Sequence, residues 1–361
     1  MLERLLNADA REATLVPSKV ELSRTFLKGQ KLTETTVPPS DRETSAPIAD
    51  IILNPTPSPV APVLTDELRM AVDAVVREWA AVEALSRAGL SPPYSSLIFG
   101  PPGTGKTLTA LYLAEKLGLP VVRARIDGIV SSFLGTTARN LSNLFEFANR
   151  YQCILLLDEF DAIAKLRDDP HEVGEIKRVV NTLLQNLDSR AGIGLTIAIT
   201  NHPSLLDPAV WRRFEVRLEV PAPQFEQRLE LVETFLVPLK PDSHIVRFMA
   251  WITEGQTGAD IRTMIDTLKR YVAMNRDTRT ETAWLEALTS FAARNSGGGQ
   301  DVRTKFLLSD RKELAEALDS SMVPDFTQRE IADIVSKDQT TVSRWISAKR
   351  KSGNEEEGMN A

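Results

Sequence analysis

A glycine-rich run that ends in lysine and threonine is the part of the sequence with the most specific chemistry. The run reads Gly100-Pro101-Pro102-Gly103-Thr104-Gly105-Lys106-Thr107. An apolar, strand-like run ending at Phe99 precedes it, and a helical pattern from Leu108 to Leu117 follows. In such a setting, glycines let backbone N–H groups turn inward around an anionic phosphate, and the helix N-terminus adds positive charge. The sequence therefore predicts a phosphate-binding loop.

Two residues of this loop have specific expected roles. We expect Lys106 to reach the β- and γ-phosphates of a nucleotide and the Thr107 hydroxyl to bind Mg²⁺. The residues predicted to contact the nucleotide are Gly100, Pro101, Pro102, Gly103, Thr104, Gly105, Lys106, Thr107 and Leu108. The alternative is a chance Gly-Pro turn with a surface lysine, which the strand–loop–helix context disfavours.

Two acids follow another apolar run. Asp158 and Glu159 come directly after residues 154–157. In open α/β sheets ligands gather at the carboxyl ends of strands, so both carboxylates are expected beside the nucleotide. Asp158 is the predicted partner of Mg²⁺, directly or through water, and Glu159 is the predicted base that polarises the attacking water. Without the loop, an exposed acidic strand end would be the simpler interpretation.

Asn201 ends a further strand-like run, residues 197–200. A side-chain amide at this position could hold the attacking water against the γ-phosphate. Asparagine is also common in turns, so the catalytic and the structural interpretations both stay open.

The elements that must position these residues alternate along the chain. Short apolar runs at 97–99, 121–124, 154–157 and 196–199 are separated by helical patterns. Such runs suit strands that are buried on both faces, and the alternation favours a doubly wound parallel sheet. The expected fold class is α/β: a P-loop NTPase sheet, a small helical lid domain and a small all-α C-terminal domain.

Composition shifts predict the domain boundaries. Prolines crowd the segment before residue 64, and Ser296-Gly297-Gly298-Gly299 is typical of a flexible linker. The predicted organisation is an N-terminal helix and Pro-rich linker (1–64), a nucleotide-binding α/β domain (65–222), a helical lid (223–295), a linker (296–304), a helix-turn-helix-like domain (305–351) and a tail (352–361).

Charge and composition exclude several classes of protein. The chain has 361 residues and a formal net charge of -6, so any contact with DNA must come from a local basic surface. No apolar run is long enough to cross a bilayer, and the N-terminus is too charged for a secretory signal. The single cysteine, Cys153, lies in an apolar run, which indicates a core thiol and fits a reducing cytoplasm.

Residues 66–294 resemble one module of the AAA family of P-loop ATPases, in its substrate-threading subfamily. The loop, the acids Asp158-Glu159 and Asn201 match three of the family's motifs. The resemblance implies ATP hydrolysis with Mg²⁺ in a homo-oligomeric ring, a hexamer, that acts on a protein client.

Two further stretches carry the resemblance. Residues 206–215 are similar to the segment with arginine fingers, which implies that Arg212 and Arg213 reach the nucleotide of a neighbouring subunit. Ordinary surface ion pairing is the alternative for both arginines. Residues 258–261 are similar to the lid motif near the adenine, which implies nucleotide contacts from Gly258 and Ala259.

The triplet Phe133-Leu134-Gly135 resembles the pore loop that grips an extended polypeptide in this family. The resemblance implies that Phe133 and Leu134 bind the client, and the alternative is a phenylalanine packed in the local core. The sequence departs from the family's pattern at Thr136, where the family usually has Glu, and the finger segment lacks the usual Pro-Gly.

Residues 327–346 resemble a bacterial helix-turn-helix, with a capping box at Thr327 and Glu330. The resemblance implies duplex-DNA binding, with Lys349, Arg350 and Lys351 meeting phosphates. The predicted groove-facing residues are Gln339, Thr340, Thr341, Ser343 and Arg344. The alternative is a helical hairpin that docks a protein.

Three functional hypotheses follow. The first is a hexameric ATP-driven protein remodeller whose C-terminal module anchors it to DNA or represses its own gene. The second is a DNA-acting ATPase, such as a transposition or replication accessory. The third is an ATP-gated regulator or antitoxin, since a single AAA module with such a tail is similar to ATPases that pair with a subtilisin-like protease.

Overall fold

The computed structural model describes residues 29–56, 61–130, 134–164, 173–190, 192–274, 281–294 and 303–359. The chain forms two compact units. The first unit runs to Pro101 and continues from Lys106 to Val220, and the second combines Pro102–Gly105 with the chain from Pro221 onward.

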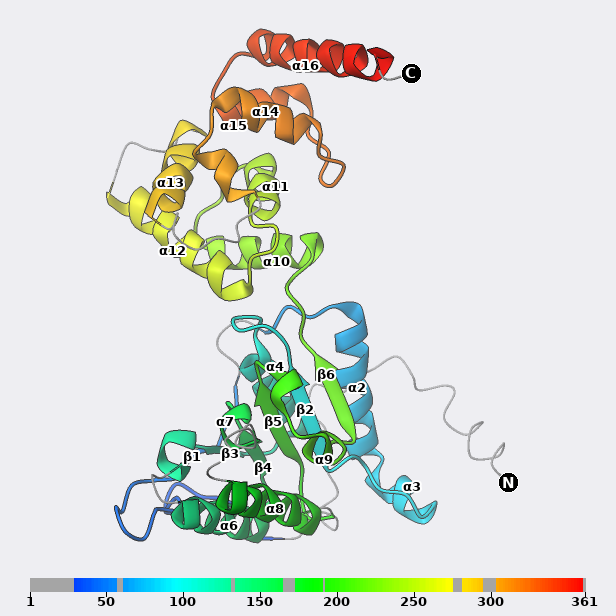
Figure 1. The fold of residues 1–361 in the computed structure, drawn as a ribbon, viewed down its shortest axis with the longest axis vertical. Coiled ribbons are helices and arrows are strands. Elements are labelled where there is room, and N and C mark those ends of the chain that lie inside the picture. Colours follow the sequence, from blue (N-terminus) through cyan, green and yellow to red (C-terminus); the bar gives the residue numbers. More distant parts are fainter. Residues whose placement is uncertain are drawn as a thin grey trace. The chain divides into compact units, whose positions relative to one another are not determined.

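A six-stranded sheet forms the centre of the first unit (Figure 1). Its strands are β1 (Ala49–Ile52), β2 (Ser95–Phe99), β3 (Val121–Ala124), β4 (Ile154–Leu157), β5 (Thr196–Thr200) and β6 (Val216–Glu219). They lie in the order β1-β3-β4-β5-β2-β6, and every pair is parallel except β1 with β3. The predicted parallel α/β sheet is therefore confirmed, with one antiparallel strand added at its edge.

Helices cover both faces of this sheet. They are α2 (Asp66–Ala80), α3 (Val82–Arg87), α4 (Lys106–Leu117), α5 (Ile126–Ile129), α6 (Leu134–Arg150), α7 (Asp161–Ala164), α8 (Val173–Arg190), the 3₁₀ turn η1 (Pro203–Leu205) and α9 (Pro208–Trp211). Along β4, Ile154 and Leu156 pack in a core with residues of α2 and α4. Leu155 and Leu157 pack in a second core with α6 and α8. This alternation of side chains is the doubly wound arrangement expected of strands buried on both faces.

Cys153 directly precedes β4 and is buried, as the apolar run predicted. Burial raises the pKa of its thiol, which keeps the sulfur protonated at neutral pH.

The segment before residue 64 is not a linker throughout, which corrects the sequence-based prediction. Ile48 and Ala49 are fully buried, and β1 pairs with β3 from Ala49↔Ala124 to Ile52↔Val121. Asp41 holds the preceding turn, because its carboxylate accepts hydrogen bonds from the N–H groups of Glu43 and Thr44. The Pro-rich composition of this segment favoured a linker and did not indicate the four-residue strand β1. The predicted helix near the N-terminus lies outside the described residues.

Asp41 also joins this arm to α6. Its carboxylate accepts a 2.6 Å hydrogen bond from the amide of Asn140, which is only 1% exposed. The backbone N–H of Thr44, the Asn140 amide and the N–H of Glu43 together lower the pKa of Asp41 from 3.8 to about 2.

A pH-dependent stability follows from this shift. Because the folded pKa lies below the unfolded value, ionised Asp41 stabilises the native state above about pH 4, and that contribution disappears as the pH falls toward 2. We expect Asp41→Asn to lower the unfolding temperature at pH 6, and the difference from wild type to shrink progressively below pH 4. Thermal unfolding of both proteins from pH 6 downward measures this difference in unfolding temperature. A difference that stays constant with pH contradicts the assignment.

Helices alone make up the described part of the second unit. They are α10 (Phe225–Leu236), α11 (Ser243–Ile252), α12 (Gly258–Met274), α13 (Glu281–Arg294), the 3₁₀ turn η2 (Thr304–Leu307), α14 (Arg311–Asp319), α15 (Gln328–Val335) and α16 (Gln339–Met359). In neither unit is any described helix long and apolar enough to cross a membrane.

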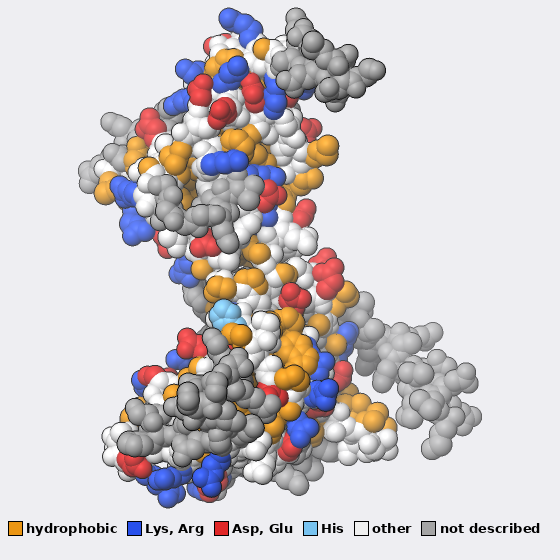
Figure 2. Space-filling view, viewed as in Figure 1, with side chains coloured by type: hydrophobic (Ala, Val, Ile, Leu, Met, Phe, Trp, Pro, Cys, Tyr) orange, Lys and Arg blue, Asp and Glu red, His pale blue; other side chains and the backbone are white. Residues whose placement is uncertain are grey.

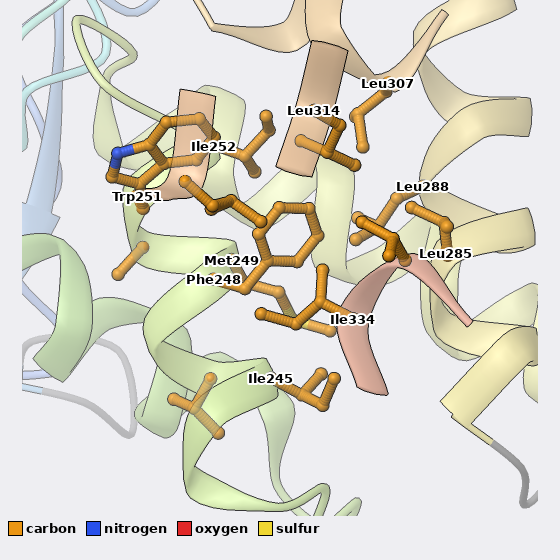
Figure 3. Close-up of a cluster of buried hydrophobic side chains, with 14 of the residues drawn as sticks. Ile245, Phe248, Met249, Trp251, Ile252, Leu285, Leu288, Leu307, Leu314 and Ile334 are labelled. Carbon is orange, nitrogen blue, oxygen red and sulfur yellow. The ribbon is translucent and has the colours of Figure 1, made fainter. Parts of the chain in front are cut away.

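A single hydrophobic core runs through the second unit, from Val232 on α10 to Ile346 on α16 (Figure 3). The sequence suggested separate lid and C-terminal domains, and the structure differs here. Small domains bury a smaller fraction of their surface than large ones and are marginally stable, and α14 to α16 share their buried residues with α11 and α13 in one core.

Candidate functional site

The phosphate-binding loop joins β2 to α4 within six residues, since β2 ends at Phe99 and α4 begins at Lys106. Gly100, Gly103 and Gly105 have φ values of +145°, +77° and +96°, in the region that favours glycine. A Cβ atom on Gly100 would lie 2.2 Å from the carbonyl oxygen of Val220. Glycine is therefore required at this position by both conformation and space.

Lys106 is directed into this loop. Its side chain is 6% exposed, and its ammonium group donates to the carbonyl oxygens of Gly100 at 2.9 Å and Pro101 at 2.6 Å. Burial lowers the pKa of Lys106, while the charges of Asp158 and Asp161 act in the opposite direction. A buried cation inside a glycine loop is well suited to bind phosphate oxygens.

Thr107 and Asp158 meet although they are far apart in the sequence. The Thr107 hydroxyl donates to the Asp158 carboxylate at 3.1 Å, and the second carboxylate oxygen accepts from the N–H of Glu159 at 3.0 Å. The first turn of α4 and the end of β4 thus bring together a hydroxyl and a carboxylate. Both are the hard oxygen ligands that Mg²⁺ prefers beside nucleotide phosphates, so the residues fit the predicted metal.

Glu159 and Asn201 follow the neighbouring parallel strands β4 and β5. Glu159 is exposed and has a φ of +51°, which is uncommon for a residue with a side chain. Such local strain is frequent at functional sites and depends on the surrounding structure to hold it. Here the next residue, Phe160, is fully buried and its N–H donates to the carbonyl of Ile199.

Asp161 belongs to this site but was missed from the sequence. Its carboxylate accepts a 2.9 Å hydrogen bond from the Thr200 hydroxyl, and its charge acts on Lys106. It therefore links the ends of β4 and β5 beside the loop. The available signal was a third acid that follows Asp158 and Glu159 closely. Asp161 was overlooked because it begins the helix α7 and does not directly follow the strand.

The two predicted finger arginines differ in their surroundings. Both are exposed and directly follow α9. Asp207 caps the N-terminus of α9, because its carboxylate accepts a 2.6 Å hydrogen bond from the N–H of Ala209. Arg213 forms a 2.8 Å ion pair with Asp188 of α8. Arg212 makes no side-chain ion pair within the described residues. Of the two, Arg212 is therefore the side chain without an ion pair among the described residues.

Trp211 fixes the position of α9. Its ring meets the ring of Phe99, the last residue before the phosphate loop, edge to face at 5.5 Å. The Arg217 guanidinium lies over Trp211 at 5.2 Å and donates to its carbonyl oxygen at 3.2 Å. No pattern in the sequence indicates this contact, because Phe99 and Trp211 are far apart along the chain and the pairing of β2 with β6 brings their segments together.

Gly258 and Ala259 begin α12 in the second unit, which also contains the loop tip Pro102–Gly105. The Ala259 N–H donates to the carbonyl oxygen of Gly103 at 3.1 Å. Their predicted contact with the nucleotide stays a prediction. Of the predicted pore residues, Phe133 lies outside the described residues, and Leu134 begins α6 without a described side chain.

Two local features of the predicted helix-turn-helix segment are present at α15 and in the turn that follows it. Thr327 and Glu330 form the predicted capping box, and Ser336 takes the left-handed conformation, with φ +52°, where the motif commonly has glycine. Among the predicted groove-facing residues, Gln339, Thr340 and Arg344 are exposed.

Other predicted DNA contacts have partners within the chain. Ser343 and Thr341 are half-buried, and Thr341 donates its hydroxyl at 2.7 Å and its N–H at 2.8 Å to the carboxylate of Asp338. Arg350 binds both carboxylate oxygens of Asp319 at 3.1 Å, and Lys349 donates to the Glu316 carbonyl. The expected phosphate contacts of Lys349 and Arg350 would have to replace these bonds.

Comparison with known proteins matches residues 96–222 to the family model described as ATPase family associated with various cellular activities (AAA). An uncharacterized AAA family ATPase of Sinorhizobium fredii is 45% identical over 141 residues, which cover 39% of this chain and 43% of that protein. The proteasome-activating nucleotidase of Pyrococcus abyssi is 38% identical over 205 residues, 54% of this chain and 50% of that protein.

A eukaryotic relative and a solved structure extend these matches. The 26S proteasome subunit RPT4 of Saccharomyces cerevisiae is 33% identical over 207 residues, 55% of this chain and 47% of the subunit. The chain thus spans about half the length of these curated relatives. The crystal structure of the FIGL-1 AAA domain matches the fold with a TM-score of 0.53 and 23% identity, and covers 70% of this chain and 93% of that one.

Proposed function

We propose that the chain, whose residues 96–222 match the AAA ATPase family model, hydrolyses ATP with Mg²⁺ in a homo-oligomeric ring and uses the energy to remodel a protein client. The convergence of Lys106, Thr107 and Asp158 at one loop–helix junction carries this proposal. The relatives named as proteasome-activating nucleotidases and a proteasome subunit favour a protein client.

Each side chain has a defined task in the proposed reaction. Lys106 exchanges the loop carbonyls for oxygens of the β- and γ-phosphates, and the loop N–H groups hold the remaining charge. Thr107 and Asp158 would hold Mg²⁺, which supplies electrostatic stabilisation of the phosphates. Glu159 accepts a proton from the attacking water while the bond to ADP breaks, and Asn201 orients that water.

The ring is the second part of the proposal. Arg212 is exposed and without an ion pair in the described part of the chain, so its guanidinium is available to the γ-phosphate of a neighbour. We propose a hexamer, with clients gripped by Phe133 and Leu134. Closed rings arise when the same pair of unlike surfaces repeats around an axis, and a finger supplied in trans requires such a pair.

Client capture tests the remodelling function. Full-length Glu159→Gln, loaded with ATP, is expected to retain client proteins through affinity purification, because stalled hydrolysis keeps the gripping state occupied. The same variant in ADP is the matched control and should release them. Mass spectrometry of the retained proteins distinguishes a client from a partner such as a subtilisin-like protease. Equal protein recovery in ATP and ADP contradicts remodelling.

Duplex DNA is a second proposed partner, at the surface made by α15 and the first turns of α16. Arg329, Lys337 and Arg344 are exposed there and make no ion pair within the described residues, whereas Lys312 and Arg350 pair with acids. Figure 2 shows basic and acidic side chains interspersed on the visible face, so any attraction to DNA is local. DNA affinity that falls as salt rises and weakens in Arg344→Ala is the expected result.

A further inference from the structure

The lid helices, α10 to α13, and the C-terminal helices, α14 to α16, form one packed body. The labelled side chains in Figure 3 come from both sets of helices and meet in its core. They are Ile245, Phe248, Met249, Trp251 and Ile252 of α11, Leu285 and Leu288 of α13, Leu307 of η2, Leu314 of α14 and Ile334 of α15. Close-packed interiors resist compression and transmit strain, so a displacement of α15 reaches the lid helices directly.

A charged clamp adds a directional contact to this core. Arg247 of α11 pairs with Glu330 of α15, donates to the Asp325 carbonyl at 3.1 Å, and lies over the ring of Phe326 at 5.3 Å. The same Glu330 carboxylate accepts hydrogen bonds from the N–H and the hydroxyl of Thr327. The N-terminus of α15 is thus fixed to the lid through one guanidinium.

The phosphate-loop tip is part of the same body. Residues Pro102–Gly105 cluster with the second unit. A Cβ atom on Gly103 would lie 2.6 Å from the Thr257 hydroxyl oxygen and 3.1 Å from Cβ of Ala259, so the packing leaves no free space at the loop tip. The buried residues of α12, among them Ile261 and Ile265, enter the core that also contains Ile334.

We propose that the α15–α16 surface is a regulatory input to the nucleotide site, so that duplex DNA on that surface and nucleotide at the phosphate loop change each other's affinity. The inference rests on the proposed ATP and DNA functions and adds their coupling. Thermodynamic linkage requires the effect to be reciprocal, with the same factor in both directions. The Arg247 clamp is the named element that transmits it.

Two titrations of the full chain measure this coupling. A fluorescent ADP analogue is titrated with Mg²⁺, with and without a saturating short DNA duplex, at low salt. The duplex is then titrated with and without saturating ADP. We expect each affinity to change by roughly fivefold or more, by equal factors. Wild-type protein that binds both ligands with unchanged affinities overturns the coupling.

Variants locate the coupling in the clamp. Arg247→Met keeps an apolar stem over Phe326 but removes the ion pair and the Asp325 hydrogen bond. Its coupling factor is expected to approach one while ADP and DNA each still bind. Lys240→Met is the matched control, because it removes an exposed cation of the same unit that makes no ion pair with Arg247 or Glu330 in the described part of the chain, and it should keep the full coupling factor.

A second clamp variant tests whether a loss of coupling in Arg247→Met could come from misfolding instead of the lost ion pair. Glu330→Gln preserves the shape needed for the capping box and removes the charge that Arg247 binds, so its coupling should also fall. Full coupling in both clamp variants overturns the inference. Absence of DNA binding by wild type removes the DNA surface and the inference together but leaves ADP binding intact, whereas absence of ADP binding refutes the ATPase proposal itself.

Discussion

Arg212→Ala is expected to lower kcat for ATP hydrolysis in the proposed ring by ~10³-fold or more, the range typical of arginine fingers. Arg213→Ala is expected to retain most of the activity. The reason is that Arg213 already forms a 2.8 Å ion pair with Asp188 of its own subunit, whereas Arg212 makes no ion pair among the described residues. Steady-state ATPase assays above the assembly concentration compare the two variants.

Mixed rings separate a trans role from a local one. Arg212→Ala subunits keep their own Glu159, and Glu159→Gln subunits keep their own Arg212. Co-assembly of these two inactive variants should therefore restore hydrolysis at interfaces where an intact base meets an intact finger. If the mixture assembles but stays inactive, Arg212 does not act across subunits. If Arg213→Ala is the inactive variant, the ion pair with Asp188 is broken on assembly and the assignment of the finger is wrong.

Glu159→Gln and Lys106→Ala are expected to fail at different steps. Removing the base should lower kcat by ~10²- to 10⁴-fold and leave ATP binding nearly unchanged. Lys106→Ala removes the ammonium group and should weaken ATP binding by about 1.5–3 kcal/mol, because charge-assisted hydrogen bonds to phosphate are lost. Equilibrium binding of ATP and single-turnover hydrolysis distinguish these outcomes for each variant.

Thr107→Ser is the matched control for both variants, since it keeps the hydroxyl that donates to Asp158. It should bind and hydrolyse ATP at rates close to those of wild type. Rapid hydrolysis by Glu159→Gln would show that the base lies elsewhere, with Asp161 the next carboxylate to test, because its charge already acts on Lys106.

Much of the nucleotide site could be predicted from the sequence because its signals are local. The phosphate loop needs glycines at fixed positions between a strand and a helix, and that order is visible in residues 96–117. Strands β2, β3, β4 and β5 were each apparent as short apolar runs. The order of these strands in the sheet was not predicted, because right-handed connections fix the handedness of each crossing but not which strands become neighbours.

Other features depend on long-range contacts that leave little trace in a single sequence. β1 is too short and too close to prolines to stand out, and it is stabilised by pairing with β3 and by burial of Ala49, which are both long-range contacts. The edge-to-face contact of Trp211 with Phe99 joins residues more than a hundred positions apart. The shared core of α11 and α15 was missed because each helix, considered alone, only shows that one of its faces is buried.

The antiparallel pairing of β1 with β3 also decides where the chain can be shortened. A shortened protein that starts at Thr65, just before α2, would keep every motif of the nucleotide site but would expose the N–H and C=O groups of β3 along the open border of the sheet. Unpaired borders of this kind recruit strands from other molecules. Such a protein would be prone to aggregation at concentrations where the longer chain stays dispersed.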